Sequence, residues 1–425
     1  MPFDSLKSEA NAPPMNETAD STGQDDDHGP WRRTLWAMVA VQFVMSISFN
    51  IVAPIMPLFL PDLGVTTPAA VNLWAGVLAA ATSCVAVFAA PIWGGLADRH
   101  GRKLMVLRST LGIGIFTFLM GIALGPWQML GLRAGMGLLA GFNSAATVMV
   151  ASQVPERRLG YAMGWMSTGT LVGSLIGPVI GGGIADLTGS FRLPFFFGGT
   201  LCIGAFLVTL FLVPERFTPP DKSKAKASLL AGIAIVARSR PLLSLIVVLM
   251  MGQFATHAVQ PVITLHVQDM LGPRPNLATL GGIAYSVTGI AGALAVPYLG
   301  RRSDRVGYRT TLLICLAGAA LFTAPQALPL GYPAFVAERF GLGLFVGGVL
   351  PAANALIGKL TDPAQRGTTY GLLSSAYFIG NTTGPLTGGV VAASFGINWV
   401  FALTAAMLTA NLIWVWLVVP DDRLK

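Results

Sequence analysis

The sequence predicts an all-α integral membrane protein in which twelve transmembrane helices form two six-helix halves. Three observations support this fold class. Of the 425 residues, 53% are hydrophobic and 11% are charged, whereas a soluble domain carries about 25% charged residues. Apolar runs long enough to cross about 30 Å of hydrocarbon as helices recur along the chain. The second half of the chain also repeats motifs of the first half.

The apolar runs are continuous and do not alternate with polar residues, which favours helices over a β-barrel. In the first half, the predicted spans are 33–60, 70–96, 104–124, 127–152, 160–185 and 193–213. In the second half, they are 241–268, 279–299, 309–328, 333–359, 368–394 and 398–419. The chain thus divides into a disordered cytoplasmic tail (1–30), an N-terminal bundle (31–213), a cytoplasmic linker (214–240), a C-terminal bundle (241–420) and a short cytoplasmic tail (421–425).

The two halves share motifs in the same order and at nearly the same offset. The run GGLADRHGRK at 94–103 returns as GRRSDRVGYR at 300–309, so Asp304 follows Asp98 by 206 residues (304 − 98). RAGMG at 133–137 returns as RFGLG at 339–343, also 206 residues later (339 − 133). GSLIGPVIGG at 173–182 returns as GNTTGPLTGG at 380–389, 207 residues later (380 − 173). Because both halves start on the same side of the membrane, the duplication predicts a pseudo-two-fold axis along the membrane normal.

The formal net charge of +8 is also typical of nucleic-acid-binding proteins. The positions of the charges argue against a nucleic-acid partner, because nearly all Lys and Arg lie in loops on one side and the opposite loops hold only Arg192 and Arg274. This positive-inside bias places both termini in the cytoplasm. The sequence contains no metal-ligand cluster, no phosphate-binding loop and no nucleophile paired with a base. We therefore expect neither an enzyme nor a bound cofactor or metal.

The repeated motifs resemble signatures of the major facilitator superfamily, and 173–182 resembles the fifth-span signature of its drug/proton antiporters. Segments at 93–99 (WGGLADR), 107–109 (LRS) and 350–357 (LPAANALI) look like bacterial multidrug efflux transporters linked to fosfomycin and deoxycholate resistance. The resemblance covers about residues 31–420. It implies a proton-coupled, alternating-access antiporter of the bacterial inner membrane that exports small amphipathic drug-like substrates and confers antibiotic resistance. We expect a monomer surrounded by membrane lipid.

The resemblance implies that the loop motif forms a latch, which joins the halves on the cytoplasmic side in the outward-open state. Asp98 would face the N-terminus of span 11, where the helix dipole favours a negative charge, and Arg102 would be its partner. The second copy around Asp304 would mirror this contact against span 5. The alternative is that these charges only end helices and obey the positive-inside rule. The latch residues are Gly94, Asp98, Arg99, Gly101, Arg102, Lys103, Asp304, Arg305 and Arg309.

The Gly-Pro motif predicts two bent helices with smooth faces. Pro178 removes one helical N–H, and glycines at every fourth residue leave a groove into which another helix can pack closely. We expect these faces to be the moving surfaces between the halves. Ordinary glycine-rich packing is the alternative. The motif residues are Gly173, Gly177, Pro178, Gly181, Gly384 and Pro385.

Arg133 lies inside span 4, where a charge is costly and must face a cavity or a partner. The resemblance implies a role in proton coupling, although spans 1 and 4 lack the buried acid that many such exporters carry. For Arg133 and Arg339, the alternative is that their side chains extend to the membrane interface. For His257, the alternative is a histidine that is only hydrogen-bonded in the core. The coupling candidates are Arg133, Asp98, Glu338, Arg339, His257 and Asp62.

The substrate cavity is expected at mid-membrane between the halves, lined in this superfamily by spans 1, 4, 7 and 10. The same side chains can equally be helix contacts. Two other functions stay open, which are export of a metabolite such as a sugar or amino acid, and a non-transporting membrane sensor. The cavity candidates are Gln42, Phe49, Asn50, Asn143, Gln253, His257, Gln260 and Asn354.

Overall fold

The computed structural model describes residues 31–214, 239–361 and 366–419. Every regular element in these ranges is helical, which confirms the predicted fold class. The predicted tails (1–30 and 421–425) and nearly all of the linker lie outside the described residues.

The described part of the N-terminal half contains eight α-helices and two 3₁₀ turns. They are α1 (Trp31–Ile51), α2 (Met56–Phe59), η2 (Pro61–Leu63), α3 (Pro68–His100), α4 (Arg102–Met120), α5 (Pro126–Leu138), α6 (Phe142–Ala151), η3 (Glu156–Arg158), α7 (Leu159–Thr188) and α8 (Leu193–Leu212). The C-terminal half repeats this plan. Its elements are α10 (Arg240–Ala258), η4 (Gln260–Val262), α11 (Ile263–Leu271), α12 (Leu277–Val306), α13 (Tyr308–Thr323), η5 (Ala324–Ala327), α14 (Tyr332–Leu360), α15 (Arg366–Phe395) and α16 (Ile397–Val418).

Eleven helical segments among the described residues are long and apolar enough to cross a membrane. They match eleven of the twelve predicted spans. The remaining span corresponds to α15, which is 30 residues long but has the polar run Asn381, Thr382 and Thr383 at its middle. Like the other spans, α15 packs against long helices of the bundle, which in its case are α3 and α10.

Three spans that the sequence predicted as continuous are broken. The first span turns at 52–55 between α1 and α2, and the seventh turns between α10 and α11. Pro54 and Pro261 lie at these two breaks, where a residue without an N–H interrupts the helical hydrogen bonds. The fourth span breaks between α5 and α6, where Gly141 adopts a φ of +112°, a backbone conformation that suits glycine.

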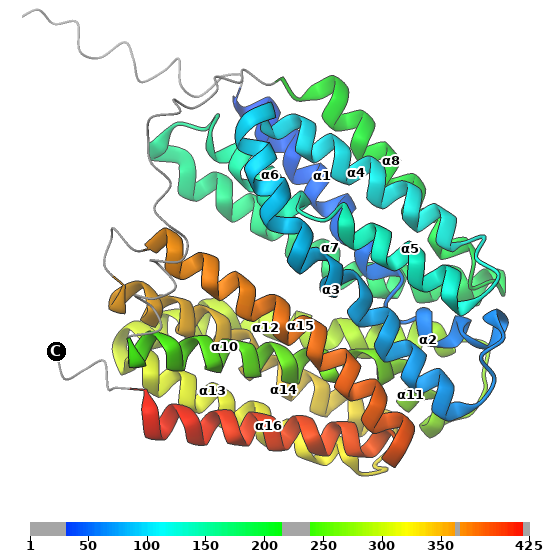
Figure 1. The fold of residues 1–425 in the computed structure, drawn as a ribbon. Helices are drawn as coiled ribbons and strands as arrows, with labels where there is room; N and C mark the ends of the chain where they lie inside the picture. Colours follow the sequence, from blue (N-terminus) through cyan, green and yellow to red (C-terminus); the bar gives the residue numbers. More distant parts are fainter. Residues whose placement is uncertain (1–30, 215–238, 362–365, 420–425) are drawn as a thin grey trace, which may run out of the picture.

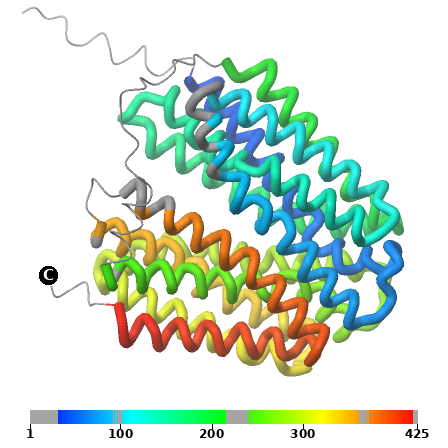
Figure 2. The backbone as a smooth tube through the Cα atoms, viewed as in Figure 1, coloured from blue at the N-terminus to red at the C-terminus, as the bar shows by residue number. Residues whose placement is uncertain are grey.

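The two halves meet through two pairs of long helices, α3 with α15 and α7 with α12. Figure 1 shows the halves close together near α2 and α11 and separating toward the end where α10 begins and α16 ends. Figure 2 follows the same path, with the blue end of α3 against the red-orange end of α15. The contact between the halves is therefore confined to one end of the molecule.

Candidate functional site

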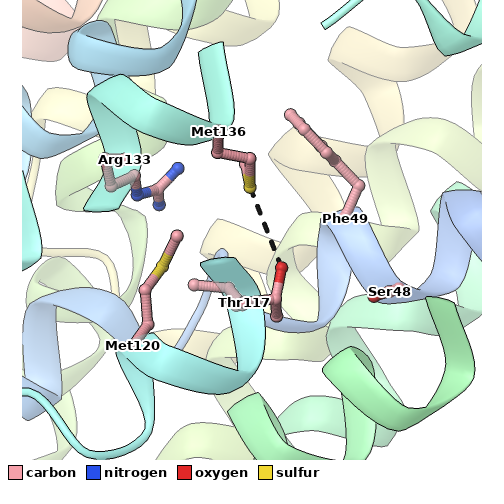
Figure 3. Close-up of a pocket in the computed structure, with 7 residues that line it drawn as sticks. Ser48, Phe49, Thr117, Met120, Arg133 and Met136 are labelled. Carbon is pink, nitrogen blue, oxygen red and sulfur yellow. Dashed lines mark hydrogen bonds between the residues drawn. The ribbon is translucent and has the colours of Figure 1, made fainter. Parts of the chain in front are cut away.

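Arg133 of α5 extends its guanidinium into a small pocket of the N-terminal half (Figure 3). The walls are mostly apolar and include Met120, Met136 and Phe49. In this conformation the cavity volume is about 10 Å³, which is room for about one water molecule. The Thr117 hydroxyl contacts the sulfur of Met136 at 3.8 Å. A single positive charge thus enters a soft, adaptable apolar space.

Arg133 and its repeat partner Arg339 both lie within the helical bundle without a carboxylate partner among the described residues. The Nε of Arg133 is buried and has no hydrogen-bond partner there, although the Arg133 carbonyl accepts a bond from the Thr82 hydroxyl at 3.2 Å. Arg339 is 7% exposed, and its Nε donates to the carbonyl of Ala284 at 3.0 Å. Because charge inside a membrane usually has a partner, this pair marks the region as a candidate functional site.

Tyr285 of α12 lies within electrostatic range of both arginines, one from each half. Its hydroxyl donates to the backbone carbonyl of Gln260, at the break after α10. The side-chain Oε1 of Gln260 lies 3.0 Å from Nδ1 of His257. The structure thus connects two predicted cavity residues, His257 and Gln260, to Tyr285. Sequence analysis missed Tyr285, because a lone tyrosine in an apolar span belongs to no recognisable pattern.

Two other predicted cavity residues meet in the N-terminal half. Gln42 of α1 donates from Nε2 to Oδ1 of Asn143 at 2.8 Å. Gln42 is 3% exposed and its Oε1 has no partner among the described residues, whereas Asn143 is exposed at the start of α6. This pair therefore connects the first span to the broken fourth span.

The break in the fourth span is stabilised by Trp93 and Arg108, which lie in segments that resemble the family but received no role from the sequence. Trp93 donates from Nε1 to the carbonyl of Leu138 at 2.7 Å. Arg108 stacks on the Trp93 ring, 3.4 Å from its centroid, and donates to the carbonyl of Ala140 at 3.0 Å. Carbonyls released by a helix break inside a membrane need such local donors.

The remaining cavity candidates are less central. Asn50 donates back to the carbonyl of Ser46 at 2.8 Å, and Gln253 shares a hydrogen bond with the Tyr377 side chain. Both act as helix contacts in this conformation, which was the alternative interpretation. Asn354 is half-buried and makes no hydrogen bond to another described residue.

The other coupling candidates do not join the arginine pair. Asp62 is exposed in η2, in the connection between α2 and α3. Glu338 is half-buried in α14 next to Arg339, but neighbouring residues of a helix point about 100° apart. The side chains of Asp98 and Arg99 lie outside the described residues, and so does the environment of Gly94.

The first copy of the loop motif is described only from Gly101 onward. Gly101 adopts a φ of +91° between α3 and α4. Arg102 donates to the carbonyl of Val148 at 3.2 Å, and Lys103 donates to the carbonyl of Leu210 at 2.9 Å. These two contacts stay within the N-terminal half. Whether Arg102 partners Asp98 stays a prediction.

The second copy of the loop motif does not make the mirrored contact with span 5 in this conformation. Asp304 accepts a hydrogen bond from the Tyr308 hydroxyl at 2.8 Å, and Arg309 donates to the carbonyl of Trp416 at 2.7 Å. Arg305 is exposed. Both bonds stay within the C-terminal half, because the two halves are apart at this end (Figure 1).

The expected role of the glycine rows as moving surfaces between the halves is wrong. A Cβ added to Gly173 or Gly177 would lie 2.5 or 2.8 Å from a backbone carbonyl of α1, in the same half, and a Cβ on Gly181 would also clash with a carbonyl of α1. A Cβ at Gly384 would lie 2.7 Å from the Phe254 carbonyl of α10, again in its own half. The rows let helices of one half pack closely, because glycine leaves room for a neighbouring backbone.

The faces of α7 and α15 beside those rows make the contact between the halves. A Cβ on Gly182 would clash with the Ala278 carbonyl of α12. The carbonyl of Pro385 would likewise clash with a Cβ on Gly76 of α3. Thus the prolines of the motif lie at the interface between the halves, whereas the three-glycine rows lie inside each half.

Asp186, at the end of α7, binds the first turn of α12 in the other half. Its Oδ2 accepts from the Thr279 N–H at 2.7 Å and from the Thr279 hydroxyl at 2.5 Å. Its Oδ1 accepts from the Ala278 N–H at 3.2 Å. The helix dipole favours a carboxylate at this place. Sequence analysis missed Asp186, because an acid at the end of a span looks like an ordinary loop charge.

Residues 38–325 and 276–425 match the family described as the Major Facilitator Superfamily. The Multidrug resistance protein MdtG of Proteus mirabilis (strain HI4320) is 39% identical over 387 residues, which cover 91% of this chain and 96% of that protein. The protein of the same name from Serratia proteamaculans (strain 568) is 39% identical over 388 residues, with 91% and 93% covered.

Solved structures resemble this fold at low sequence identity. A mutant form of the nucleoside transporter NupG has a TM-score of 0.75 and 14% identity, covering 92% of this chain and all of that chain. A bacterial homolog of the human lysosomal transporter Spinster, in an inward-facing and occupied conformation, has a TM-score of 0.74 and 16% identity, covering 92% and 97%. At such identities the likeness shows the fold alone.

Proposed function

This chain belongs to the Major Facilitator Superfamily, a family of transporters and not of enzymes, and on that premise we propose that it exports drug-like compounds in exchange for protons. The exporter is a multi-pass protein of the bacterial inner membrane, with both termini in the cytoplasm. It works as a monomer surrounded by lipid. Its substrates are small amphipathic molecules. The identity to proteins named for multidrug resistance, over nine-tenths of the chain, supports this substrate class.

The observation that carries the proposal is the arrangement of the halves around the arginine pair. Arg133 and Arg339 come from opposite halves and approach the same tyrosine, Tyr285. The contacts between α7 and α12 lie at one end of the molecule, and the halves separate toward the other end (Figure 1). With cytoplasmic termini, this arrangement corresponds to an inward-facing state. A site between two rocking halves is how such transporters alternate access.

The lining of the Arg133 pocket supports varied amphipathic substrates. Met120 and Met136 offer flexible, polarizable surface, and Phe49 is 51% exposed. Such side chains adapt to ligands of different shape, whereas a strictly polar site would select one ligand. The guanidinium and the hydroxyls of Ser48 and Thr117 in the lining supply the few polar groups that orient a ligand.

Proton-driven flux into liposomes tests the proposal. The purified full-length protein is reconstituted, a pH gradient is imposed, and accumulation of a panel of labelled drugs, sugars and amino acids is measured. Accumulation of several unrelated drugs, abolished by a protonophore, is the expected result. If only one sugar or amino acid is transported, the function is metabolite export and the proposal of drug export is wrong. Absence of any flux, together with unchanged drug sensitivity after gene disruption, would favour a sensor.

A further inference from the structure

We propose that the proton-binding group of this transporter is the imidazole of His257 on the broken seventh span. This inference rests on the proposed proton exchange and names the group that carries it out. The imidazole acts through Gln260 and Tyr285 on the arginine pair that joins the two halves.

The first argument is the position of the acids. Asp62, Glu156, Asp269 and Asp304 are exposed, and Asp186 is held at the far end of the interface by α12. No described carboxylate reaches Arg133 or Arg339. Among the described residues, a proton carrier that communicates with these arginines is therefore another titratable side chain. Among the described histidines, His257 is the one hydrogen-bonded to Gln260, whose backbone carbonyl accepts the hydroxyl of Tyr285.

The second argument is the chemistry of the imidazole ring. Gln260 offers its side-chain oxygen to Nδ1 of His257 at 3.0 Å. An oxygen acceptor requires a hydrogen on Nδ1, so the neutral ring keeps its lone pair on Nε2. A proton arriving from the membrane exterior binds Nε2, and no other bond forms or breaks. The same proton leaves from Nε2 to the cytoplasmic side, while the bond to Gln260 persists throughout.

The third argument is the connection from the ring to both halves. The Gln260 carbonyl accepts the hydroxyl of Tyr285, and Tyr285 lies within electrostatic range of Arg133 and Arg339. A proton on His257 adds a positive charge that Gln260 and Tyr285 connect to the two arginines. Like charges repel strongly in a low dielectric. Protonation thereby changes the balance between arrangements of the halves, because Arg133 belongs to the other half.

The surroundings of His257 contain few competing groups. The helices that pack against α10 are α14, α15 and α16, and α16 has no titratable side chain. On α14, Lys359 stacks on Tyr308 and Tyr332 donates to the Leu280 carbonyl. The other titratable residues on these helices are Glu338 and Arg339 on α14 and Arg366, Tyr370 and Tyr377 on α15; the side chains of Arg366 and Tyr370 lie outside the described residues.

The internal repeat provides a comparison within the same molecule. At the offset of 207 residues that relates Pro54 to Pro261 (261 − 54), His257 corresponds to Asn50 and Gln260 to Ala53. Asn50 bonds only to its own helix, and residues 78–79, equivalent to Tyr285, are apolar. The network therefore exists in one half only, which is expected of a specialised site and not of a packing feature that both halves need.

The test measures how pH shifts the balance between conformations, so it requires no known substrate. Spin labels are placed on both halves at the outer end, and their distance distribution is recorded from pH 5 to pH 9 in the reconstituted full-length protein. We expect a pH-dependent change in the unmutated protein that is lost in His257→Gln. His266→Gln is the matched control, because His266 is a buried histidine of the same span that packs between Phe335 and Phe401. It should keep the response.

A second variant covers the case in which His257→Gln does not fold. Gln260→Glu places a carboxylate beside the ring and should move the midpoint of the pH response upward by about one pH unit, because an opposite charge favours the protonated imidazole. An unchanged midpoint in Gln260→Glu, or an unchanged response in folded His257→Gln, overturns the assignment of His257 alone. Absence of any pH response in the unmutated protein overturns proton coupling itself, and the assignment with it.

Discussion

At the scale of single residues, the arginine of the fourth span presents the clearest physical problem. Its Nε has no partner among the described residues, and no described carboxylate neutralises its charge. Burial of such a group is costly, so its retention indicates a role that an apolar residue cannot fill. A ligand that supplies hydrogen-bond acceptors in the pocket of Figure 3 would complete its coordination.

Replacement of this arginine tests that role. Arg133→Gln should insert and fold normally, because the native guanidinium forms no hydrogen bond within the described chain. Export should fall about tenfold or more, since a hydrogen bond to a charged group contributes about 1.5–3 kcal/mol. Drug efflux and the amount of protein in the membrane are measured side by side. Arg192→Gln is the matched control. Arg192 donates to the carbonyls of Gly121 and Ala123, so its replacement should lower the amount of stable protein and not the export per molecule.

The acid of the loop motif gives a prediction from sequence. Asp98→Asn should leave membrane insertion intact and abolish drug resistance in cells, because an amide cannot replace the charge that the helix dipole and Arg102 favour. Resistance is scored as the minimum inhibitory concentration at matched protein levels. Near-normal resistance would remove the latch assignment and leave these charges as markers of topology.

At the scale of helices, two adjacent glycines of α7 serve different contacts. A Cβ on Gly181 would clash with the Ile51 carbonyl of α1, whereas a Cβ on Gly182 would clash with the Ala278 carbonyl of α12. One contact lies inside a half and the other lies between the halves. Consecutive positions on a helix differ by about 100°, which explains how one Gly-Gly pair serves both packings.

Alanine at each of these glycines should therefore have a different effect. Gly181→Ala should lower thermal stability by the equivalent of about 1–3 kcal/mol, because the internal packing of the half cannot open. Gly182→Ala should keep the stability of each half but disfavour the closed outer end. Melting of the purified proteins and spin-label distances across the outer end separate the two. Equal melting temperatures would contradict the assignment of Gly181 to internal packing.

The contact between the end of α7 and the start of α12 should set the balance between conformations. Asp186→Asn keeps an acceptor but removes the charge that three donors surround. The population with a closed outer end should fall about tenfold relative to the open one, which corresponds to about 1.4 kcal/mol. Thr279→Val removes only the hydroxyl and should shift the balance less. If both variants show the distance distribution of the unmutated protein, the contact does not control the conformation.

At the scale of the whole molecule, a covalent link across the outer end tests whether the halves must separate there. Asn72 donates to the Ala392 carbonyl across the interface at 3.2 Å, so these two adjacent positions are the pair to replace by cysteines. In a background without Cys84, Cys202 and Cys315, oxidation should stop export and reduction should restore it. Each single cysteine variant is the control. Export that persists in the oxidised pair would show that this end need not open.

The sequence by itself determined the class of the molecule, its duplication, the spans and the residues that stand out as charges in apolar helices. Hydropathy and repeats are properties of the linear chain, so Arg133 and its counterpart Arg339 were found before any contact was known. Only the tertiary structure decided which helix face meets which partner. The glycine rows were assigned to the wrong neighbour, because residue spacing reveals a face but not what covers it.

The same limit explains the polar network and the break in the fourth span. Gln260 and Tyr285 are 25 residues apart, and Arg108 reaches Ala140 from 32 residues away. Such pairs depend on how each helix is rotated about its axis and where it ends, and both are fixed by packing against the rest of the bundle. Hydropathy and motifs in the sequence could therefore indicate a membrane transporter, whereas only the packed helices could bring Gln260 to the hydroxyl of Tyr285.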